Sequence, residues 1–227
     1  MGNQRLLNFT ECRLWNGNRY FTQGFGTFVV AQHVGEDGYC PDMLRFISLL
    51  TDRGCFVASL HLRAFDNTQH DFGSRHTSFF HWIHYLREKH GLGKPRLFAY
   101  CRGGLQLLNF WCSYPEEAEV CACLSPVTDP YVYPKTIQRL VDAYGVKDFG
   151  GIYKGFCPNE RAGVLSGKDI RIWHNPKDDF IPKKKTTDVF ASKCGAVVTN
   201  MESIGHNWNH EYDNEMADFL TYESRTG

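Results

Sequence analysis

The chain has 227 residues, of which 42% are hydrophobic and 15% aromatic, and its 25 basic and 25 acidic side chains give a formal net charge of zero. This composition is ample for a buried core, while the balanced charge supplies no basic field of the kind that draws proteins to nucleic acid or anionic lipid. We therefore expect one globular domain over residues 1–227, with no nucleic-acid partner and no membrane partner.

The N-terminus and the cysteines bear on the cellular location. The first twenty residues, MGNQRLLNFTECRLWNGNRY, contain no apolar signal-peptide core, and nowhere do about 18 apolar residues run together. Nine cysteines are scattered along the chain, an odd number that cannot pair completely, so we expect reduced thiols in a cytoplasmic protein. Cys121 and Cys123 lie in an apolar segment, and we predict that they are small core residues on opposite faces of a strand.

Strand and helix patterns alternate along the chain. Short apolar runs predict strands at 26–34, 55–63, 96–101, 120–127, 169–175 and 196–204. Helical spacing of apolar residues predicts helices at 41–54, 78–91, 103–117, 182–195 and 209–224. This alternation predicts an α/β fold with a mainly parallel sheet and helices on both faces. In such sheets ligands bind beyond the carboxyl ends of the strands, so the segments after each strand are the first place to look for chemistry.

The segment FAYCRGG, residues 98–104, predicts a sharp turn between a strand and a helix. Ala99 and Gly103 stand two residues before and two after Cys101, and small residues at these places let the backbone turn tightly and expose the side chain between them. The N–H of Arg102 would then lie at the helix N-terminus, where it can donate to a developing oxyanion. Cys101 is therefore the candidate nucleophile.

A candidate acid and a candidate base follow the last two predicted strands. Asp178 lies in HNPKDDFIP, and His206 follows a glycine in SIGHNWNH, 28 residues later. Nucleophile, acid and base in this chain order form one of the known triad arrangements. The imidazole takes a proton from the nucleophile, and the carboxylate holds the imidazole in the correct tautomer. Asp129 and Asp179 remain alternatives to Asp178 as the acid.

Taken together, the motifs AYCRGG, HNPKDDFIP and GH, with QHVG after the first predicted strand, resemble those of α/β-hydrolases over about residues 26–221. QHVG is similar to the His-Gly oxyanion turn of that superfamily. The resemblance implies a triad and two oxyanion-hole N–H groups, supplied by Cys101, Asp178, His206, Arg102 and Val34. The chain departs from most of the superfamily in having cysteine where serine is usual, and Val34 where the turn has its second glycine.

Two branches of the superfamily share features of the cysteine turn. The form x-Cys-x-Gly-Gly is similar to the dienelactone hydrolase branch, whose members use a Cys-Asp-His triad on a single domain and hold the resting thiol with a glutamate, here matched by Glu36. CRGGLQLLNFWCSYPEEAEV and SPVTDP are similar to segments of bacterial esterase-like hydrolases, some acting on carbohydrate esters, that carry Ser-Arg-Gly-Gly. The sequence leaves open whether Cys101 is the native nucleophile or stands in place of a serine.

An irregular insertion at about 126–167 falls where this fold commonly places a lid. The candidates for the substrate pocket are Glu36 and three aromatic residues of the insertion, Tyr131, Tyr133 and Tyr153. The same aromatic side chains could simply pack the lid against the domain.

Two pairs of histidines raise the question of a metal ion. His70 and His76 lie in one loop, and His210 follows His206 by four residues, where it could also replace His206 as the base. Neither pair has further ligands at a spacing typical of metal sites, so we expect no metal and no cofactor.

The sequence thus predicts a hydrolase that cleaves an ester or a thioester through an acyl-cysteine, in a monomer or a homodimer. Its expected partner is a small-molecule acyl ester or thioester. Two alternatives stay open: an acyltransferase with the same triad, and a non-catalytic binding protein on the same scaffold.

Overall fold

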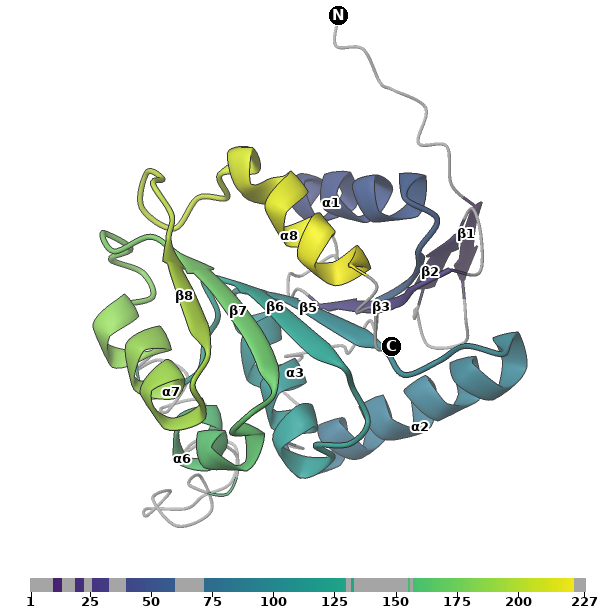
Figure 1. The fold of residues 1–227 in the computed structure, drawn as a ribbon, viewed down its shortest axis with the longest axis horizontal. Helices are drawn as coiled ribbons and strands as arrows, with labels where there is room; N and C mark the ends of the chain where they lie inside the picture. The colour runs from purple at the N-terminus through teal and green to yellow at the C-terminus, as the bar shows by residue number, and fades with distance from the viewer. Residues whose placement is uncertain are drawn as a thin grey trace, which may run out of the picture.

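The computed structural model describes residues 10–13, 19–22, 26–32, 40–59, 72–129, 132, 155 and 157–222, and within these it describes only the backbone of 10–13, 19–22 and 72–78. The described residues form three layers, with a twisted sheet between two sets of helices (Figure 1). In this part of the chain no helix combines the length and the apolar character needed to cross a bilayer.

The described strands form one open sheet in the order β1-β2-β4-β3-β5-β6-β7-β8. Their bounds are Thr10–Arg13 (β1), Arg19–Thr22 (β2), Phe28–Gln32 (β3), Phe56–Ser59 (β4), Arg96–Tyr100 (β5), Val120–Leu124 (β6), Asp169–His174 (β7) and Val197–Asn200 (β8). The six strands β3 to β8 pair in parallel with their neighbours in this order, whereas β1 pairs antiparallel with β2 and β2 pairs antiparallel with β4. The prediction of a mainly parallel sheet is confirmed.

Helices cover both faces of the sheet (Figure 1). Helices α1 and α8 lie on one face, and α2, α3, α6 and α7 lie on the other. Their bounds are Pro41–Asp52 (α1), Phe72–His90 (α2), Arg102–Ser113 (α3), Pro158–Arg161 (α6), Thr187–Cys194 (α7) and Asp213–Thr221 (α8), with 3-10 turns at Ala162–Leu165 (η3), Lys183–Lys185 (η4) and His210–Tyr212 (η5). Because strand side chains alternate between faces, each central strand contributes to both cores: Val29 packs with α1 and α8, and Val30 packs with α2 and α3.

Helix α1 shows how local sequence sets these elements. Its start has a proline at the first helical position, and the Cys40 Sγ accepts a hydrogen bond from the Met43 N–H at 3.4 Å. Gly54, with a φ of +81°, follows its end. Four apolar residues between these limits stand at positions i, i+3, i+4 and i+7 on one helix face and are fully buried: Met43, Phe46, Ile47 and Leu50.

Some sequence predictions need correction. The β1–β2 hairpin at the sheet edge was not predicted, α2 begins six residues earlier than expected, and the 3-10 turn η4 precedes α7. Cys121 and Cys123 are buried as predicted, but their placement on opposite faces is wrong. Residues two apart on a strand point to the same face, and the two Sγ atoms lie 3.4 Å apart. The expected lid at about 126–167 lies for the most part outside the described residues.

Candidate active site

Cys101 occupies the turn between β5 and α3, and its backbone conformation is unusual. Its φ is 53° and its ψ is −123°, in a region that residues with a side chain seldom adopt. Such conformations cost of order 1–3 kcal/mol and persist only where the surroundings enforce them, often at active sites. The thiol is less exposed than the sequence predicted, since only 8% of the residue reaches solvent. Cys101 is therefore nearly buried and does not lie on an open surface.

The end of β6 and the segment after it hold this turn in place. The Cys101 N–H donates to the Leu124 carbonyl at 3.1 Å, and the Val127 N–H donates to the Cys101 carbonyl at 2.8 Å. Gly104 makes close approach possible, because a Cβ at this position would lie 2.5 Å from the Cβ of Pro126. Ser125 also has a positive φ, of 42°, which directs the chain across the start of α3. The need for a small residue thus extends beyond Gly103 to Gly104.

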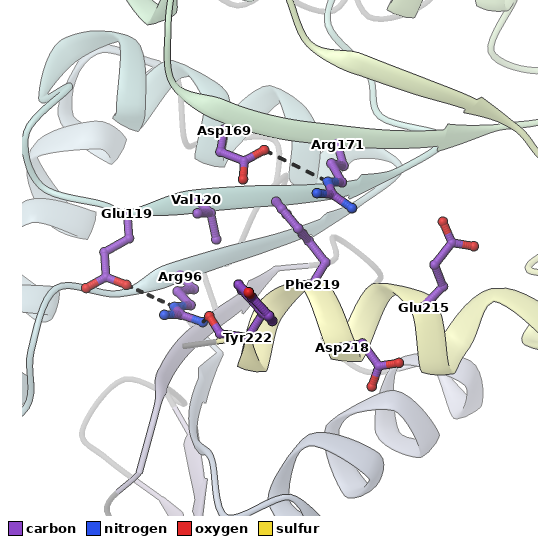
Figure 2. A pocket seen from close by; sticks show the side chains of 9 residues that line it. All are labelled: Arg96, Glu119, Val120, Asp169, Arg171, Glu215, Asp218, Phe219 and Tyr222. Atoms are coloured by element: carbon purple, nitrogen blue, oxygen red, sulfur yellow. Dashed lines mark hydrogen bonds and ion pairs between the residues drawn. The ribbon is translucent and has the colours of Figure 1, made fainter. Parts of the chain in front are cut away.

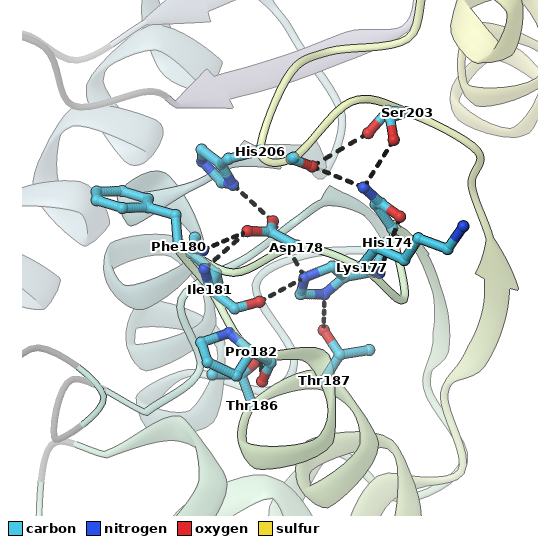
Figure 3. A network of polar contacts seen from close by, with 12 residues as sticks. His174, Lys177, Asp178, Phe180, Ile181, Pro182, Thr186, Thr187, Ser203 and His206 are labelled. Atoms are coloured by element: carbon cyan, nitrogen blue, oxygen red, sulfur yellow. Dashed lines mark hydrogen bonds and ion pairs between the residues drawn. The ribbon is translucent and has the colours of Figure 1, made fainter.

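The structure brings Asp178 and His206 together (Figure 3). Asp178 lies in the turn after β7 and His206 in the segment after β8, and the His206 Nδ1 lies 2.7 Å from the Asp178 Oδ2. The other carboxylate oxygen, Oδ1, accepts the backbone N–H groups of Phe180 at 3.0 Å and Ile181 at 2.8 Å. The Asp178 side chain is fully buried and the His206 side chain is 18% exposed. This is the geometry in which a carboxylate orients an imidazole and fixes its tautomer.

Asp178 and His206 stabilise each other's charged forms. Burial raises the pKa of Asp178, but hydrogen bonds from His174, His206 and the Ile181 N–H outweigh it and hold that pKa well below its usual range. Burial lowers the pKa of His206, yet the hydrogen bond to Asp178 and the neighbouring Cys101 thiol raise it from 6.5 to about 9. His206 therefore carries a positive charge at neutral pH beside the candidate nucleophile.

The Nε2 atom of His206 is the one available for proton transfer. It is buried and has no hydrogen-bond partner of standard length and angle among the described residues. The Cys101 thiol is nevertheless close enough to act on the pKa of His206. A long or poorly aligned contact of this kind is common in the resting state of enzymes and shortens when substrate binds.

Three residues that the sequence analysis did not single out hold His206 in place. The Tyr100 ring stacks on the His206 ring with 5.7 Å between centroids, and the Phe180 ring lies 5.2 Å away. The Asn175 Nδ2 donates to the carbonyls of Ser203 at 3.0 Å and Gly205 at 2.7 Å. Asn175 thereby ties the turn that carries Asp178 to the segment that carries His206. The signal in the sequence was its place directly after the strand, in HNP.

The remaining predicted site residues divide into two groups. Arg102 is the first residue of α3, so its N–H lies at the positive end of the helix dipole, as the sequence predicted. The other oxyanion-hole and pocket candidates, like His70, lie outside the described residues: Val34, Glu36, Tyr131, Tyr133 and Tyr153. Only the backbone of His76 is described.

The alternative acid and base residues have other positions. Asp179 lies next to Asp178 and faces Gly205, with 3.8 Å between its Oδ1 and the place of a Cβ there. Asp129 lies in the segment after β6, where its carbonyl accepts the Val132 N–H at 3.3 Å. His210 is held between two carboxylates, those of Asp42 at 3.1 Å and Asp213 at 3.0 Å.

A pocket of about 820 Å³ lies at the opposite edge of the sheet (Figure 2). It is lined by the first residues of β5, β6 and β7 and by one side of α8. Its arginines are engaged: Arg96 contacts Glu119 at 2.9 Å and two carbonyls at the end of α8, and Arg171 lies over the Phe219 ring. Because the candidate triad follows the carboxyl ends of the strands, this pocket is separate from the candidate active site.

Comparisons with known proteins place the fold. No family model matches the chain, and no curated protein sequence matches it. Solved structures do match over nearly the whole chain. An esterase of the bacterial hormone-sensitive lipase family superposes with a TM-score of 0.71 at 16% identity, covering 94% of this chain and 84% of that one. The monoacylglycerol lipase of Paleococcus ferrophilus superposes with a TM-score of 0.68 at 13% identity, covering 90% of this chain and 97% of the lipase.

A peptidase shares the same arrangement. Porphyromonas gingivalis dipeptidyl peptidase 4 superposes with a TM-score of 0.68 at 15% identity over 93% of this chain. The chain spans only about a third of that peptidase, 35% of its length. At these identities the likeness concerns the course of the backbone, and all three superpositions agree on it. The chain has the α/β-hydrolase fold.

Proposed function

We propose that the chain is a hydrolase of carboxylic esters or thioesters, with Cys101 as nucleophile, His206 as general acid and base, and Asp178 as the residue that orients His206. The observation that carries the proposal is the contact of 2.7 Å between His206 Nδ1 and Asp178 Oδ2 beside a cysteine with a φ of 53° at a helix start. The strained backbone at Cys101 would have no evident use in a binding protein, where it would only cost stability. The esterase and the lipase of the same fold are consistent with this class of reaction.

The first half of the reaction forms an acyl-enzyme. The Cys101 sulfur attacks the carbonyl carbon of the substrate as a thiolate, and a bond between sulfur and carbon forms. The negative charge moves to the carbonyl oxygen, where the Arg102 N–H and a second N–H at Val34 would stabilise it. As the tetrahedral intermediate collapses, the bond to the leaving oxygen or sulfur breaks. His206 gives its Nε2 proton to that leaving group.

The second half releases the acid. His206, now neutral, takes a proton from a water molecule that attacks the acyl carbon. The bond between carbon and Sγ breaks, the carboxylic acid leaves, and Cys101 returns to its starting state beside protonated His206. Asp178 stays ionised throughout, because its hydrogen bonds keep its pKa well below neutral pH. We propose that Glu36 and the tyrosines at 131, 133 and 153 line the substrate pocket, with the insertion at about 126–167 as a lid.

Intact-protein mass spectrometry after exposure to short-chain p-nitrophenyl esters and thioesters tests this proposal. We expect a mass increase equal to one acyl group, located on Cys101 by peptide mapping, with release of p-nitrophenol from the esters and of the corresponding thiol from the thioesters. Cys101→Ala should abolish both, and Cys101→Ser, which supplies a hydroxyl nucleophile in place of the thiol, should retain some turnover. Unchanged turnover in Cys101→Ala would show that another residue is the nucleophile. Addition of alcohol or amine acceptors separates hydrolysis from acyl transfer, because a transferase would release the acyl group to the acceptor faster than to water.

A further inference from the structure

A second histidine contacts the candidate triad acid from the side opposite His206 (Figure 3). His174 is the last residue of β7, and its side chain is fully buried. Its Nδ1 lies 2.6 Å from the Thr187 hydroxyl at the start of α7. Its Nε2 lies 3.0 Å from the Ile181 carbonyl and 3.4 Å from the Asp178 Oδ2. Every nitrogen of this buried ring therefore has a polar partner.

The partners determine where the proton of His174 lies. A carbonyl and an ionised carboxylate can only accept hydrogen bonds, so Nε2 must carry a proton that the Ile181 carbonyl and Asp178 share. The Thr187 hydroxyl can donate as well as accept, so it donates to Nδ1 in the neutral ring. The tautomer of His174 thus follows from three fixed neighbours.

Asp178 in turn divides its hydrogen bonds between two oxygens. Oδ1 accepts two backbone N–H groups, those of Phe180 and Ile181, which hold the carboxylate in position. Oδ2 faces both histidines, at 2.7 Å from His206 and 3.4 Å from His174. We propose that His174 is a positioning residue that shares the Asp178 Oδ2 with His206 and thereby limits how strongly the acid holds the protonated base. In its relation to catalysis this inference rests on the proposed function.

The direction of the effect follows from the charge on Oδ2. A hydrogen bond from His174 draws electron density away from the carboxylate, so Asp178 attracts the imidazolium of His206 less strongly than it otherwise would. Without that bond, Asp178 stays in place through its Oδ1 contacts and holds the His206 proton more tightly. The pKa of His206 should then rise. A higher pKa makes His206 a poorer proton donor to the leaving group, which slows acylation.

The other groups that act on His206 do not change with His174. Cys101 lies beside it at the turn after β5, and Tyr100, from β5 itself, stacks on its ring. Asp179, in the same turn as Asp178, faces Gly205. Asp178 is the charged group in contact with His174 among the residues that the structure describes. A change in His206 on substitution of His174 would therefore have to pass through Asp178.

NMR titration of the His206 imidazole, assigned by comparison with His206→Ala, tests the proposal without any substrate. His174→Phe keeps a planar ring and removes the N–H, and we expect it to raise the pKa of His206 by roughly half a unit or more. His174→Gln restores an N–H in the same region and should return the pKa toward that of the unmodified protein. Thr187→Val is the matched structural control, because it removes a buried hydrogen bond from His174 but leaves Nε2–H facing Asp178.

The outcomes separate a positioning role from a merely structural one. If His174 only fills space, His174→Phe and Thr187→Val will both lower stability and neither will move the His206 titration. An unchanged or lowered pKa of His206 in folded His174→Phe would overturn the proposal, as would an equal rise in Thr187→Val. Should His174→Phe fail to fold, His174→Leu, which also lacks the N–H, takes its place. The proposal then requires a larger rise in the pKa of His206 in His174→Leu than in His174→Gln, and no rise in Thr187→Val. If Cys101 proves not to be the nucleophile, the proposed function fails, while the titration result stands independently.

Discussion

Substitution of Gly104 by alanine probes the packing that shapes the nucleophile turn. A Cβ at this position would lie 2.5 Å from the Pro126 Cβ, 3.0 Å from the Pro126 Cα and 3.2 Å from the Val127 nitrogen. Carbon atoms in contact are normally about 3.5–4.0 Å apart, so one of these contacts is short by about 1 Å or more. Two of the three atoms belong to the backbone. The Val127 N–H also donates a hydrogen bond to the Cys101 carbonyl, so the segment of Pro126 and Val127 cannot move without moving the turn at Cys101.

The expected loss of stability follows from two opposing effects. Overpacking of a well-packed site costs about 1–3 kcal/mol, and the rigid neighbours place Gly104→Ala toward the upper end of that range. Alanine is better than glycine in a helix by up to about 1 kcal/mol, which offsets part of the cost. We expect a net decrease of about 2 kcal/mol in the free energy of unfolding. For a protein of this size that decrease corresponds to a fall in Tm of about 4–8 °C.

Urea unfolding of Gly104→Ala and of a control, Gly93→Ala, measures this difference. A Cβ at Gly93 meets no atom within 4 Å, so its substitution should change stability by less than about 0.5 kcal/mol. Ester turnover should also fall in Gly104→Ala, because a shift of the turn moves Cys101 away from His206. Equal unfolding midpoints for the two variants would refute the argument that Gly104 is required by the approach of Pro126.

Three further outcomes follow from the contacts described above. The pKa of His206 is raised from 6.5 to about 9, so the contribution of protonated His206 to stability is present in full below about pH 6.5 and is lost as the pH rises through 9. The free energy of unfolding measured across this range should fall by at most about 3 kcal/mol, and Asp178→Asn should flatten its pH dependence. An unaltered pH dependence in Asp178→Asn would contradict the ion pair. Asn175→Ala removes three side-chain hydrogen bonds, including the one to the Gly205 carbonyl. It should lower kcat at least tenfold with little effect on KM, and an unchanged kcat in steady-state kinetics with a p-nitrophenyl ester would count against this role. Arg96→Ala removes the contacts between β5 and the end of α8. It should reduce the free energy of unfolding by about 1–3 kcal/mol and leave ester turnover unchanged. A loss of turnover in the folded variant would argue that the pocket lined by Arg96 takes part in the reaction.

Much of the fold could be predicted because its elements have strong local signals. Each strand from β3 to β8 is an apolar run next to a turn, and α1 combines a helical repeat of buried residues with a proline at its start and a glycine beyond its end. The β1–β2 hairpin was missed because its short segments, TECR and RYFT, are largely polar and carry no such signal. These strands exist through antiparallel pairing with the edge of the sheet, which is a tertiary interaction.

Parts of the candidate site could be predicted where neighbouring residues in the sequence set the local backbone. Small residues around Cys101 predict a tight turn, and His206 could be chosen from its place behind a glycine after the last predicted strand. In the structure that glycine, Gly205, has a φ of +60°. The residues that support the candidate triad gave weaker signals in the sequence. Tyr100, Asn175 and His174 are ordinary residues at strand ends, and only the fold shows that the first stacks on His206, the second joins two loops and the third contacts Asp178.

By itself, the sequence determined the alternation of strands and helices from β3 onward, the sharp turn at Cys101 and the candidate acid and base. These features depend on hydrophobic periodicity, backbone freedom and residue type, which act over a few neighbouring positions. The tertiary structure decided that Asp178 is the carboxylate that contacts His206, that Cys101 is nearly buried, and that His174 shares the same carboxylate oxygen. Asp178 and His206 are 28 positions apart, so their contact depends on how the strands line up in the sheet, and that alignment is set by burial on both faces rather than by any local pattern.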